Sequence, residues 1–261
     1  MARRGRGGWP TSTRSSPRSA PHSRCRDRSE PLSDAARTTA GSPLAGRAVV
    51  ITAGGTREPI DPVRYVGNRS SGRMGNALAA AAADRGAEVT LVTTVAPPPA
   101  HPRVTVVPVD TAEQMNAAVR TALAGAAVLV MAAAVADYRV PEVAPRKLKK
   151  REALTLTLVP TVDILRLLAG DPLRDGVLVV GFAAETDDAE RNAAAKLTDK
   201  RLDLVVLNDV SRADIGMGSE ENEVTVLDAG GRVAHISRRP KALVAAALLD
   251  IVEERLRRQP R

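Results

Sequence analysis

Lysine is scarce in this chain, and its few lysines are grouped where they could bind phosphate. Of the 38 Lys and Arg residues only six are Lys. Three of these fall within Lys147–Lys150, while Lys196 and Lys200 are four residues apart, which puts them on one face of a helix. A compact ammonium group is a good point-charge partner for phosphate oxygens. The pattern allows two interpretations, a polyphosphate site or ordinary solvated charge runs.

A second candidate for chemistry is the stretch Ala53–Asn76, with the sequence AGGTREPIDPVRYVGNRSSGRMGN. An apolar run leads into it and an alanine-rich run leads out of it. A strand, a glycine-rich turn and a helix that opens with free backbone N–H groups form an anion site. Asn68 could hold a developing oxyanion or a reaction intermediate, or it could close a turn or cap a helix. Ser70 or Ser71 is expected to cap the following helix.

Two further side chains follow predicted buried strands and could contact a nucleotide base. Asp137 could accept hydrogen bonds from an exocyclic amine, or it could cap a turn. Phe182 is the one phenylalanine of the chain, and it could contact a base at the sheet edge or belong to the core. Spacing alone leaves both alternatives open.

Several common catalytic constellations are missing from the sequence. The three histidines are scattered, which argues against a histidine metal site or a catalytic triad. No G-x-G-x-x-G follows the first predicted strand, and there is no P-loop signature. Glu142 stands four residues after Tyr138, where a short-chain reductase has Lys. The chain has a single cysteine, Cys25, which is too few for a disulfide framework or a cysteine zinc site.

The elements that must position these residues alternate between strand and helix, which predicts an α/β fold. Apolar runs without alternation are typical of strands in a parallel sheet covered on both faces. Thr111 and Gln114 have the spacing of a capping box, and Asp228–Gly231, between two predicted strands, predicts a hairpin turn. Residues 133–152 are predicted to form a long loop. The predicted strands are residues 49–52, 88–93, 104–109, 127–132, 154–159, 177–181, 204–207, 223–227 and 232–236, and the predicted helices are residues 72–85, 112–123, 163–169, 187–201 and 241–257.

Charge and composition divide the chain of 261 residues into two parts. Residues 1–46 carry nine Arg against three acidic residues, so they hold +6 of the net charge of +8. Their Ser, Pro, Arg and Gly content is typical of disorder. We therefore expect a disordered basic tail over residues 1–46 and one folded domain over residues 47–258. No secretory signal and no apolar run of roughly 20 residues is present, so we expect a cytoplasmic protein with no membrane partner.

In chain order, the motifs resemble the signature of one bacterial family, phosphopantothenoylcysteine synthetase, the CoaB domain of the CoaBC protein. The resemblance covers about residues 48–257, which is essentially the whole predicted domain. The motifs that carry it are Ala53–Glu58, Asp61–Tyr65, Asn68–Gly75, Ala132–Tyr138, Lys147–Lys150, Gly181–Thr186 and Asn208–Asp209.

The resemblance implies a CTP-dependent ligase of coenzyme A biosynthesis. Such an enzyme joins 4′-phosphopantothenate to L-cysteine through an acyl-cytidylate, 4′-phosphopantothenoyl-CMP, and releases pyrophosphate and then CMP. Phosphoryl-type transfer needs positioning and charge neutralisation more than a protein nucleophile, which suits a chain without catalytic Cys or His. It also implies a three-layer Rossmann-like, mainly parallel sheet with helices on both faces and a small β dimerisation region.

The same resemblance implies roles for particular residues. Asn68 resembles the residue that holds the acyl-cytidylate, and Arg64 resembles a neighbour in the same half-reaction. Lys147 resembles a triphosphate-contacting lysine on a mobile flap. The match is loose at residues 162–165, where Pro160-Thr-Val-Asp-Ile164 replaces the Asn-Pro-Asp-Ile of the family. The implied nucleotide-binding residues are Met131, Ala132, Ala133, Asp137, Lys147, Val162, Asp163, Ile164, Leu165, Phe182, Lys196 and Lys200.

The resemblance further implies Mg²⁺ with the nucleotide, with ligands that the sequence does not name, and a homodimer. In most bacteria the domain follows a flavin-dependent decarboxylase, whereas a short tail precedes it here. We therefore expect no FMN and a separate decarboxylase for the next step.

Two other functions fit the sequence less well. The missing motifs argue against an NAD(P)-dependent Rossmann-like reductase. A nucleic-acid-binding module would have to use the basic tail, and no specific nucleic acid is expected.

Overall fold

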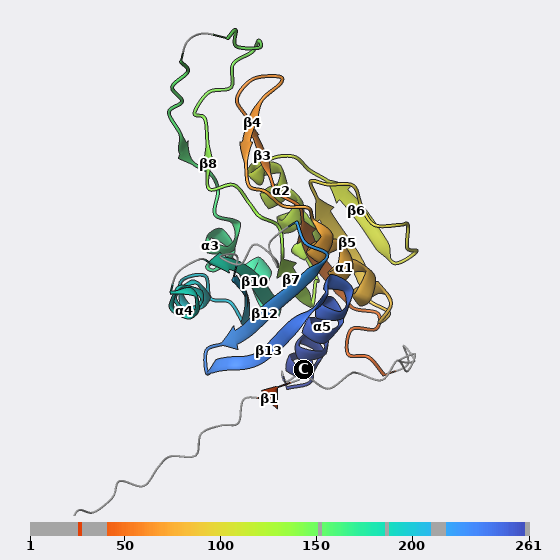
Figure 1. The fold of residues 1–261 in the computed structure, drawn as a ribbon. Coiled ribbons are helices and arrows are strands. Elements are labelled where there is room, and N and C mark those ends of the chain that lie inside the picture. The colour runs from red at the N-terminus through yellow and green to blue at the C-terminus, as the bar shows by residue number, and fades with distance from the viewer. Residues whose placement is uncertain (1–25, 28–40, 151–152, 186–187, 210–217, 259–261) are drawn as a thin grey trace, which may run out of the picture.

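The computed structural model describes residues 26–27, 41–150, 153–185, 188–209 and 218–258. Within them, a nine-stranded sheet forms the centre of the molecule (Figure 1). Its strands are β1 (Arg26–Asp27), β2 (Ala48–Ala53), β5 (Glu88–Thr93), β6 (Val104–Pro108), β7 (Val128–Met131), β10 (Leu178–Glu185), β11 (Leu204–Asp209), β12 (Glu221–Asp228) and β13 (Gly231–Pro240).

The order of the strands in the sheet is β1-β13-β12-β11-β10-β7-β2-β5-β6. The strands from β11 to β6 in this order are all parallel, and β12 is antiparallel to both β11 and β13. Ile51 in the central strand pairs with Leu91 on one side and with Val130 on the other. All three are buried, as expected for parallel strands covered on both faces.

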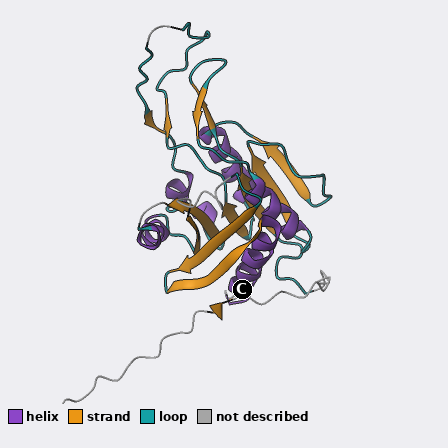
Figure 2. Cartoon of the chain, in the orientation of Figure 1, coloured by secondary structure: helices purple, strands orange, loops and turns teal. Residues whose placement is uncertain are grey.

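Helices cover both faces of the sheet (Figure 2). They are α1 (Arg73–Ala83), α2 (Ala112–Leu123), α3 (Ile164–Leu168), α4 (Ala189–Asp199) and α5 (Lys241–Arg258), with a short 3₁₀ turn at Pro172–Arg174. Successive residues of β2 face opposite sides, so Ile51 packs in a core with α1 and α5, and Val50 packs in a second core with α2, α3 and α4. The predicted three-layer, mainly parallel α/β fold is confirmed.

Two local predictions are confirmed in detail. The helix α2 spans the predicted residues, and both hydrogen bonds of the capping box between Thr111 and Gln114 are present. The turn at Asp228–Gly231 joins β12 to β13 as an antiparallel hairpin. Local side-chain chemistry decides both features, which is why the sequence predicts them well.

Two small antiparallel pairs project together from the body of the molecule (Figure 1). One is the hairpin of β3 (Arg57–Pro59) and β4 (Tyr65–Gly67), and the other pairs β8 (Tyr138–Arg139) with β9 (Val159–Pro160). We call residues 57–67 and the described residues between 138 and 160 the arm.

The predicted strand over residues 154–159 is wrong. In the described residues 153–158 there is no strand, and β9 begins at Val159. The alternation of Leu and Thr satisfies the two-residue period of a strand, but a strand also needs a neighbour to pair with. Leu154, Leu156 and Leu158 remain exposed on the arm.

The described fold begins before the predicted boundary at residue 47. Leu44 is fully buried, and the N–H of Gly46 donates to the carbonyl oxygen of Gly86 at 2.8 Å. Composition averaged over a long tail cannot reveal one buried leucine. Apart from β1, which pairs in parallel with β13, the predicted tail up to residue 40 lies outside the described residues. None of the helices in the described ranges is long and apolar enough to cross a membrane.

Candidate active site

A cavity of about 530 Å³ lies at the carboxyl ends of the parallel strands. The central strand β2 has β5 on one side and β7 on the other. The strands that follow β2 in the chain are thus added first on one side of it and then on the other, which makes β2 a topological switch point. Open α/β sheets bind ligands in the crevice outside such a switch point. Residues at the carboxyl ends of β7 and β10, residues of the segments that follow β2 and β7, and residues of β11 and β12 line the cavity.

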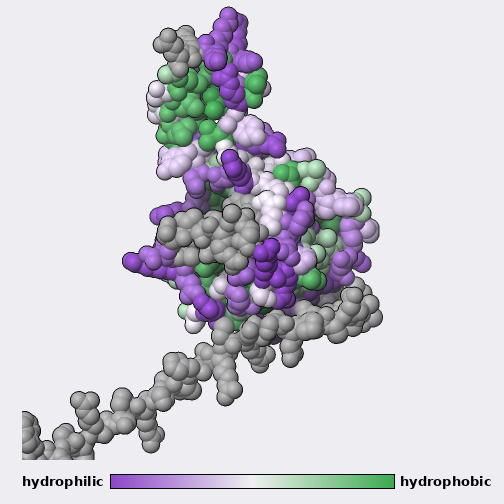
Figure 3. Space-filling view, in the orientation of Figure 1, coloured by the Kyte–Doolittle hydropathy of each residue, from purple (hydrophilic) through white to green (hydrophobic). Residues whose placement is uncertain are grey.

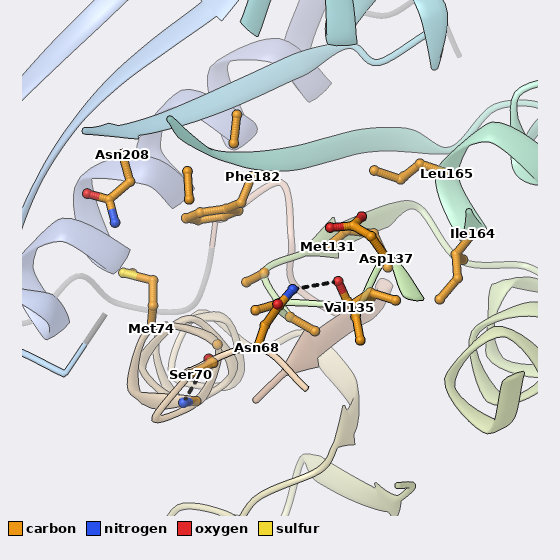
Figure 4. A pocket seen from close by; sticks show the side chains of 18 of the residues that line it. Asn68, Ser70, Met74, Met131, Val135, Asp137, Ile164, Leu165, Phe182 and Asn208 are labelled. Atoms are coloured by element: carbon orange, nitrogen blue, oxygen red, sulfur yellow. Dashed lines mark hydrogen bonds between the residues drawn. The ribbon is translucent and has the colours of Figure 1, made fainter. Parts of the chain in front are cut away.

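Asn68 is held at the cavity by the loop that follows β7. Its Nδ2 donates to the carbonyl oxygen of Val135 at 2.9 Å (Figure 4). Thr52 and Thr56 tie the same loop down, since their Oγ1 atoms accept from Ala133 N at 3.0 Å and Ala136 N at 2.8 Å. The carboxamide is thus positioned by contacts between segments far apart in the sequence.

Glycine is required where the stretch after β2 passes its neighbours. A Cβ on Gly55 would lie 2.4 Å from the carbonyl oxygen of Asn68, and one on Gly75 would lie 2.6 Å from the Cβ of Ala53. The first contact brings the backbone next to Asn68, and the second seats α1 against β2. Both glycines therefore support the cavity through close approach.

The predicted serine cap of α1 is wrong. The N-cap is Gly72, with φ of +70°, and no side chain of the described residues caps the helix. Ser70 instead accepts a hydrogen bond from the N–H of Gly72 at 3.4 Å. Because the left-handed turn at Gly72 places both serines before the helix, Ser70 and Ser71 line the cavity together with the N-terminus of α1.

Phe182 lies across the cavity from Asn68 (Figure 4), and Lys196 of α4 and Lys200, which directly follows this helix, line the same cavity. Lys196 Nζ donates to the carbonyl oxygen of Phe182 at 2.7 Å, and Lys200 Nζ lies 2.9 Å from Asp163 Oδ2. These contacts join the end of β10, the C-terminal part of α4 and the start of α3. A region with two ammonium groups beside an aromatic ring has the chemistry to hold a nucleotide.

The structure brings almost all of the predicted site residues together around this cavity. The lining includes the backbone after β7, the segment at α3 and the residues after β10. Arg64 and Lys147 are not among the lining residues; both lie on the arm. The predicted residues that line the cavity are Asn68, Met131, Ala132, Ala133, Asp137, Val162, Asp163, Ile164, Leu165, Phe182, Lys196 and Lys200.

Arg64 anchors the two halves of the arm to each other. Its Nη2 donates to the carbonyl oxygen of Leu148 at 2.7 Å, next to Lys147. The buried carboxylate of Asp61 accepts from Leu148 N at 3.1 Å and from the N–H groups of Val63 and Arg64. Burial raises the pKa of Asp61, but these three N–H donors and the Arg64 guanidinium together lower it below its ordinary value.

Three further polar residues line one end of the cavity, Asn208, Asn222 and Lys241, and the sequence predicted none of them as a site residue, although Asn208 belongs to the motif Asn208–Asp209. Asn208 ends the parallel part of the sheet in β11, Asn222 lies in β12, and Lys241 begins α5. One signal was available, because Lys241 is the sixth lysine of a chain that strongly prefers arginine. The pairing of β11 with β12, which brings these residues to the cavity, leaves no local pattern.

Lys241 is a buried cation at this end of the cavity. Its Nζ donates to the carbonyl oxygen of Ser219. Burial lowers the pKa of Lys241, the positive charge of Arg73 lowers it further, and Glu220 opposes them. Arg73 itself contacts Glu220 Oε1 at 2.9 Å and Gly218 O at 2.8 Å.

The cavity offers few ligands to a metal ion. Among the residues described by the structure, no group of three or more His, Cys, Asp or Glu side chains could hold one. Asp137 and Asp163 are the carboxylates among the residues that line the cavity. This donor set suits Mg²⁺ that arrives with a nucleotide, because Mg²⁺ is usually held by one or two carboxylates and by substrate phosphates.

The fold and the cavity define a Rossmann-like α/β protein with a ligand site at the carboxyl edge of its sheet. The family model described as DNA/pantothenate metabolism flavoprotein C-terminal domain matches residues 44–256. The chain belongs to this family, and the resemblance expected from its motifs is confirmed.

Three similar proteins illustrate the relationship. The coenzyme A biosynthesis bifunctional protein CoaBC of Escherichia coli (strain K12) is 45% identical over 213 residues, covering 79% of this chain and 52% of that protein. A crystal structure of the C-terminal domain of a CoaBC protein is 37% identical, with a TM-score of 0.69 over 84% of this chain and all of that one. A Cab2 variant solved with phosphopantothenate-cysteine is 16% identical, with a TM-score of 0.67 over 80% of this chain and 87% of that one, and so shares the fold. The chain spans about half the length of the curated relatives that it matches.

Proposed function

We propose that this chain is a CTP-dependent phosphopantothenate–cysteine ligase of coenzyme A biosynthesis. One observation carries the proposal. The residues that resemble the nucleotide and acyl-cytidylate positions of the family come from separate segments, and they meet around a single cavity. Family membership gives the biosynthetic context, since the Escherichia coli relative is named as a coenzyme A biosynthesis protein.

In the first step, a carboxylate oxygen of 4′-phosphopantothenate attacks the α-phosphorus of CTP. A bond forms between that oxygen and phosphorus, and the bond to pyrophosphate breaks. Lys196 and Lys200, with Phe182 beside them, are suited to hold the nucleotide, and Asp137 is suited to accept from the cytosine amine. Catalysis here rests on positioning and on charge neutralisation.

In the second step, the amine of cysteine attacks the acyl carbonyl of the intermediate. A C–N bond forms, the C–O bond to the phosphate breaks, CMP leaves with the electron pair, and one amine proton is released. Asn68 sits against the loop after β7, where its carboxamide can hold the acyl-cytidylate. A fixed donor aimed at developing charge is worth several kcal/mol in a water-excluded site.

Mg²⁺ bound to the nucleotide would neutralise charge on the triphosphate oxygens. Asp137 and Asp163 are the candidate protein ligands. Asp163 contacts Lys200 Nζ at 2.9 Å, so a metal at this carboxylate would compete with that ion pair. Asp137 is exposed at the cavity, but it could hold the metal only if another group accepts from the cytosine amine.

Arg64 and Lys147 keep their predicted roles as proposals. Both lie on the arm and not at the cavity. They could therefore act on the nucleotide only if the arm of this chain, or of a second copy, reaches the cavity. We also propose that the chain works as a cytoplasmic homodimer and that a separate decarboxylase consumes its product. The exposed apolar side chains of the arm support the dimer.

The decisive experiment measures pyrophosphate release by the purified chain with each of the four nucleoside triphosphates. We expect release with CTP when Mg²⁺ and phosphopantothenate are both present, and CMP release when cysteine is added. Omitting phosphopantothenate is the control, since no carboxylate then remains to accept the cytidylyl group. No pyrophosphate from the complete mixture with any nucleotide would refute a ligase, and equal use of ATP would refute the CTP preference.

A further inference from the structure

One end of the cavity contains a polar group for which the roles above give no function. The group is Asn208, Asn222 and Lys241, which lie at the ends of β11, β12 and α5 nearest the cavity. None of the three belongs to the residues assigned above to the nucleotide or to the acyl-cytidylate. Figure 4 shows Asn208 beside Met74, on the opposite side of Asn68 and Phe182 from Ile164.

Asn208 presents a hydrogen-bond acceptor that has nothing to accept from. The residue is 9% exposed, and among the described residues its Oδ1 is buried without a hydrogen-bond partner. A buried, unpaired polar atom is costly, and nearly all such atoms in native proteins are paired. The missing partner must carry an N–H or O–H group. Phosphate oxygens that are ionised at neutral pH cannot supply one.

Lys241 places a positive charge at the same end of the cavity. The residue is 7% exposed, and its ammonium group donates to Ser219 O, so it is held in a fixed position. A buried cation favours a ligand group of opposite charge. A ligand that contacts both residues would therefore carry a hydrogen-bond donor for Asn208 and an anionic group for Lys241.

An α-amino acid has this combination, because its amine and its carboxylate are attached to one carbon atom. We infer that Asn208 and Lys241 form the amino-acid subsite of the cavity, with the carboxylate of cysteine on Lys241 and its amine on Asn208 Oδ1. The inference rests on the proposed ligase function. An amine bound in this way would be directed from this end of the cavity toward the acyl carbonyl held near Asn68.

The order of the reaction makes the subsite testable, because the amino acid enters after pyrophosphate has been released. We expect Asn208→Leu and Lys241→Met each to raise the KM for cysteine at least about tenfold, the effect of losing one hydrogen bond to a charged partner. Because cysteine takes no part in the first step, pyrophosphate release measured in its absence should fall by a smaller factor than kcat/KM for cysteine does. Asn192→Leu, at an exposed asparagine of α4, is the matched control.

A second measurement isolates the contact with the carboxylate and applies to the unmodified chain as well. Cysteamine is cysteine without its carboxylate, so the ratio of kcat/KM for cysteine to that for cysteamine reports the Lys241 contact. We expect the unmodified chain to prefer cysteine, and Lys241→Met to lose most of that preference while Lys241→Arg keeps part of it.

Two results would overturn the subsite. One is equal use of cysteine and cysteamine by the unmodified chain. The other is a raised KM for CTP in both variants with the KM for cysteine unchanged, which would assign this end of the cavity to the triphosphate. Failure of the ligase itself is distinguishable, because the unmodified chain would then release no pyrophosphate under any of these conditions.

Discussion

The carboxamide of Asn68 is a single donor whose loss should separate the two half-reactions. Its Nδ2 donates to Val135 O at 2.9 Å, so Asn68→Asp would place a carboxylate against a carbonyl oxygen and add negative charge beside the acyl-cytidylate. We expect conversion of the intermediate to slow by about 10²-fold, the usual effect of removing one such donor. Single-turnover assays with labelled phosphopantothenate should then show accumulated acyl-cytidylate, while pyrophosphate is still released. Asn192→Asp is the control, and equal loss of both half-reactions would contradict the role.

The sequence predicted single residues well where strand ends and local motifs carry the signal. Phe182 lies in β10, Lys196 lies in the following helix α4 and Lys200 directly after that helix, and all three line the cavity. Asn208 and Lys241 were not predicted as site residues, because β11, which carries Asn208, and β13, which ends just before Lys241, are joined only by their long-range pairing with β12. The serine cap failed for a related reason, since the left-handed turn at Gly72 depends on packing of α1 against the sheet.

Among the elements, the arm depends on one buried carboxylate. Asp61 accepts from N–H groups of both halves of the arm, and its pKa is lowered. Because the pKa of Asp61 is lower in the folded chain than in the unfolded chain, the ionised carboxylate stabilises the arm at pH values above the unfolded pKa. This stabilisation is lost as the pH falls through the lower pKa of the folded chain. We expect Asp61→Asn to speed hydrogen exchange at the Leu148 amide by about tenfold or more, because an amide offers Leu148 a poorer acceptor.

Mass-spectrometric hydrogen exchange on peptides that include Leu148 measures this effect. In the unmodified chain, protection should persist from neutral pH to about pH 4, below which it should fall. Asp110→Asn is a matched control, because Asp110 is exposed and lies 3.8 Å from Arg57 in a surface ion pair of little energetic value. Unchanged exchange in Asp61→Asn would show that the arm is held together by other contacts.

Elements defined by local chemistry were predictable, and elements defined by partners were not. The capping box fixed the bounds of α2, and the Asp228–Gly231 turn fixed the hairpin of β12 and β13. In contrast, the alternating Leu and Thr residues of 154–158 predicted a strand that this single chain does not form. Periodicity reports which residues could share a face, but a strand forms only where another strand supplies hydrogen bonds.

At the scale of the whole molecule, the arm carries an apolar surface that a single chain leaves uncovered. Figure 3 shows hydrophobic side chains gathered on the arm, and Tyr65, Val143 and Leu154 are among its exposed residues. Contiguous apolar patches on a soluble domain mark interaction surfaces, and a second copy of the chain is the partner that the family resemblance implies. The unpaired residues 154–158 would then find their hydrogen-bond partners in the second arm.

This dimer can be tested by placing charges on the arm. The double change Leu154→Asp and Leu156→Asp should convert a dimer of about 55 kDa into a monomer of 27.5 kDa, because an unpaired carboxylate is costly in an apolar interface. Light scattering coupled to size-exclusion chromatography measures the mass directly. Leu243→Asp, at a leucine of α5 that is 55% exposed against 57% for Leu154, should leave the dimer intact. An unmodified chain that is already monomeric would refute the dimer, and an arm variant that stays dimeric would place the interface elsewhere. In either case the apolar arm would need a different partner.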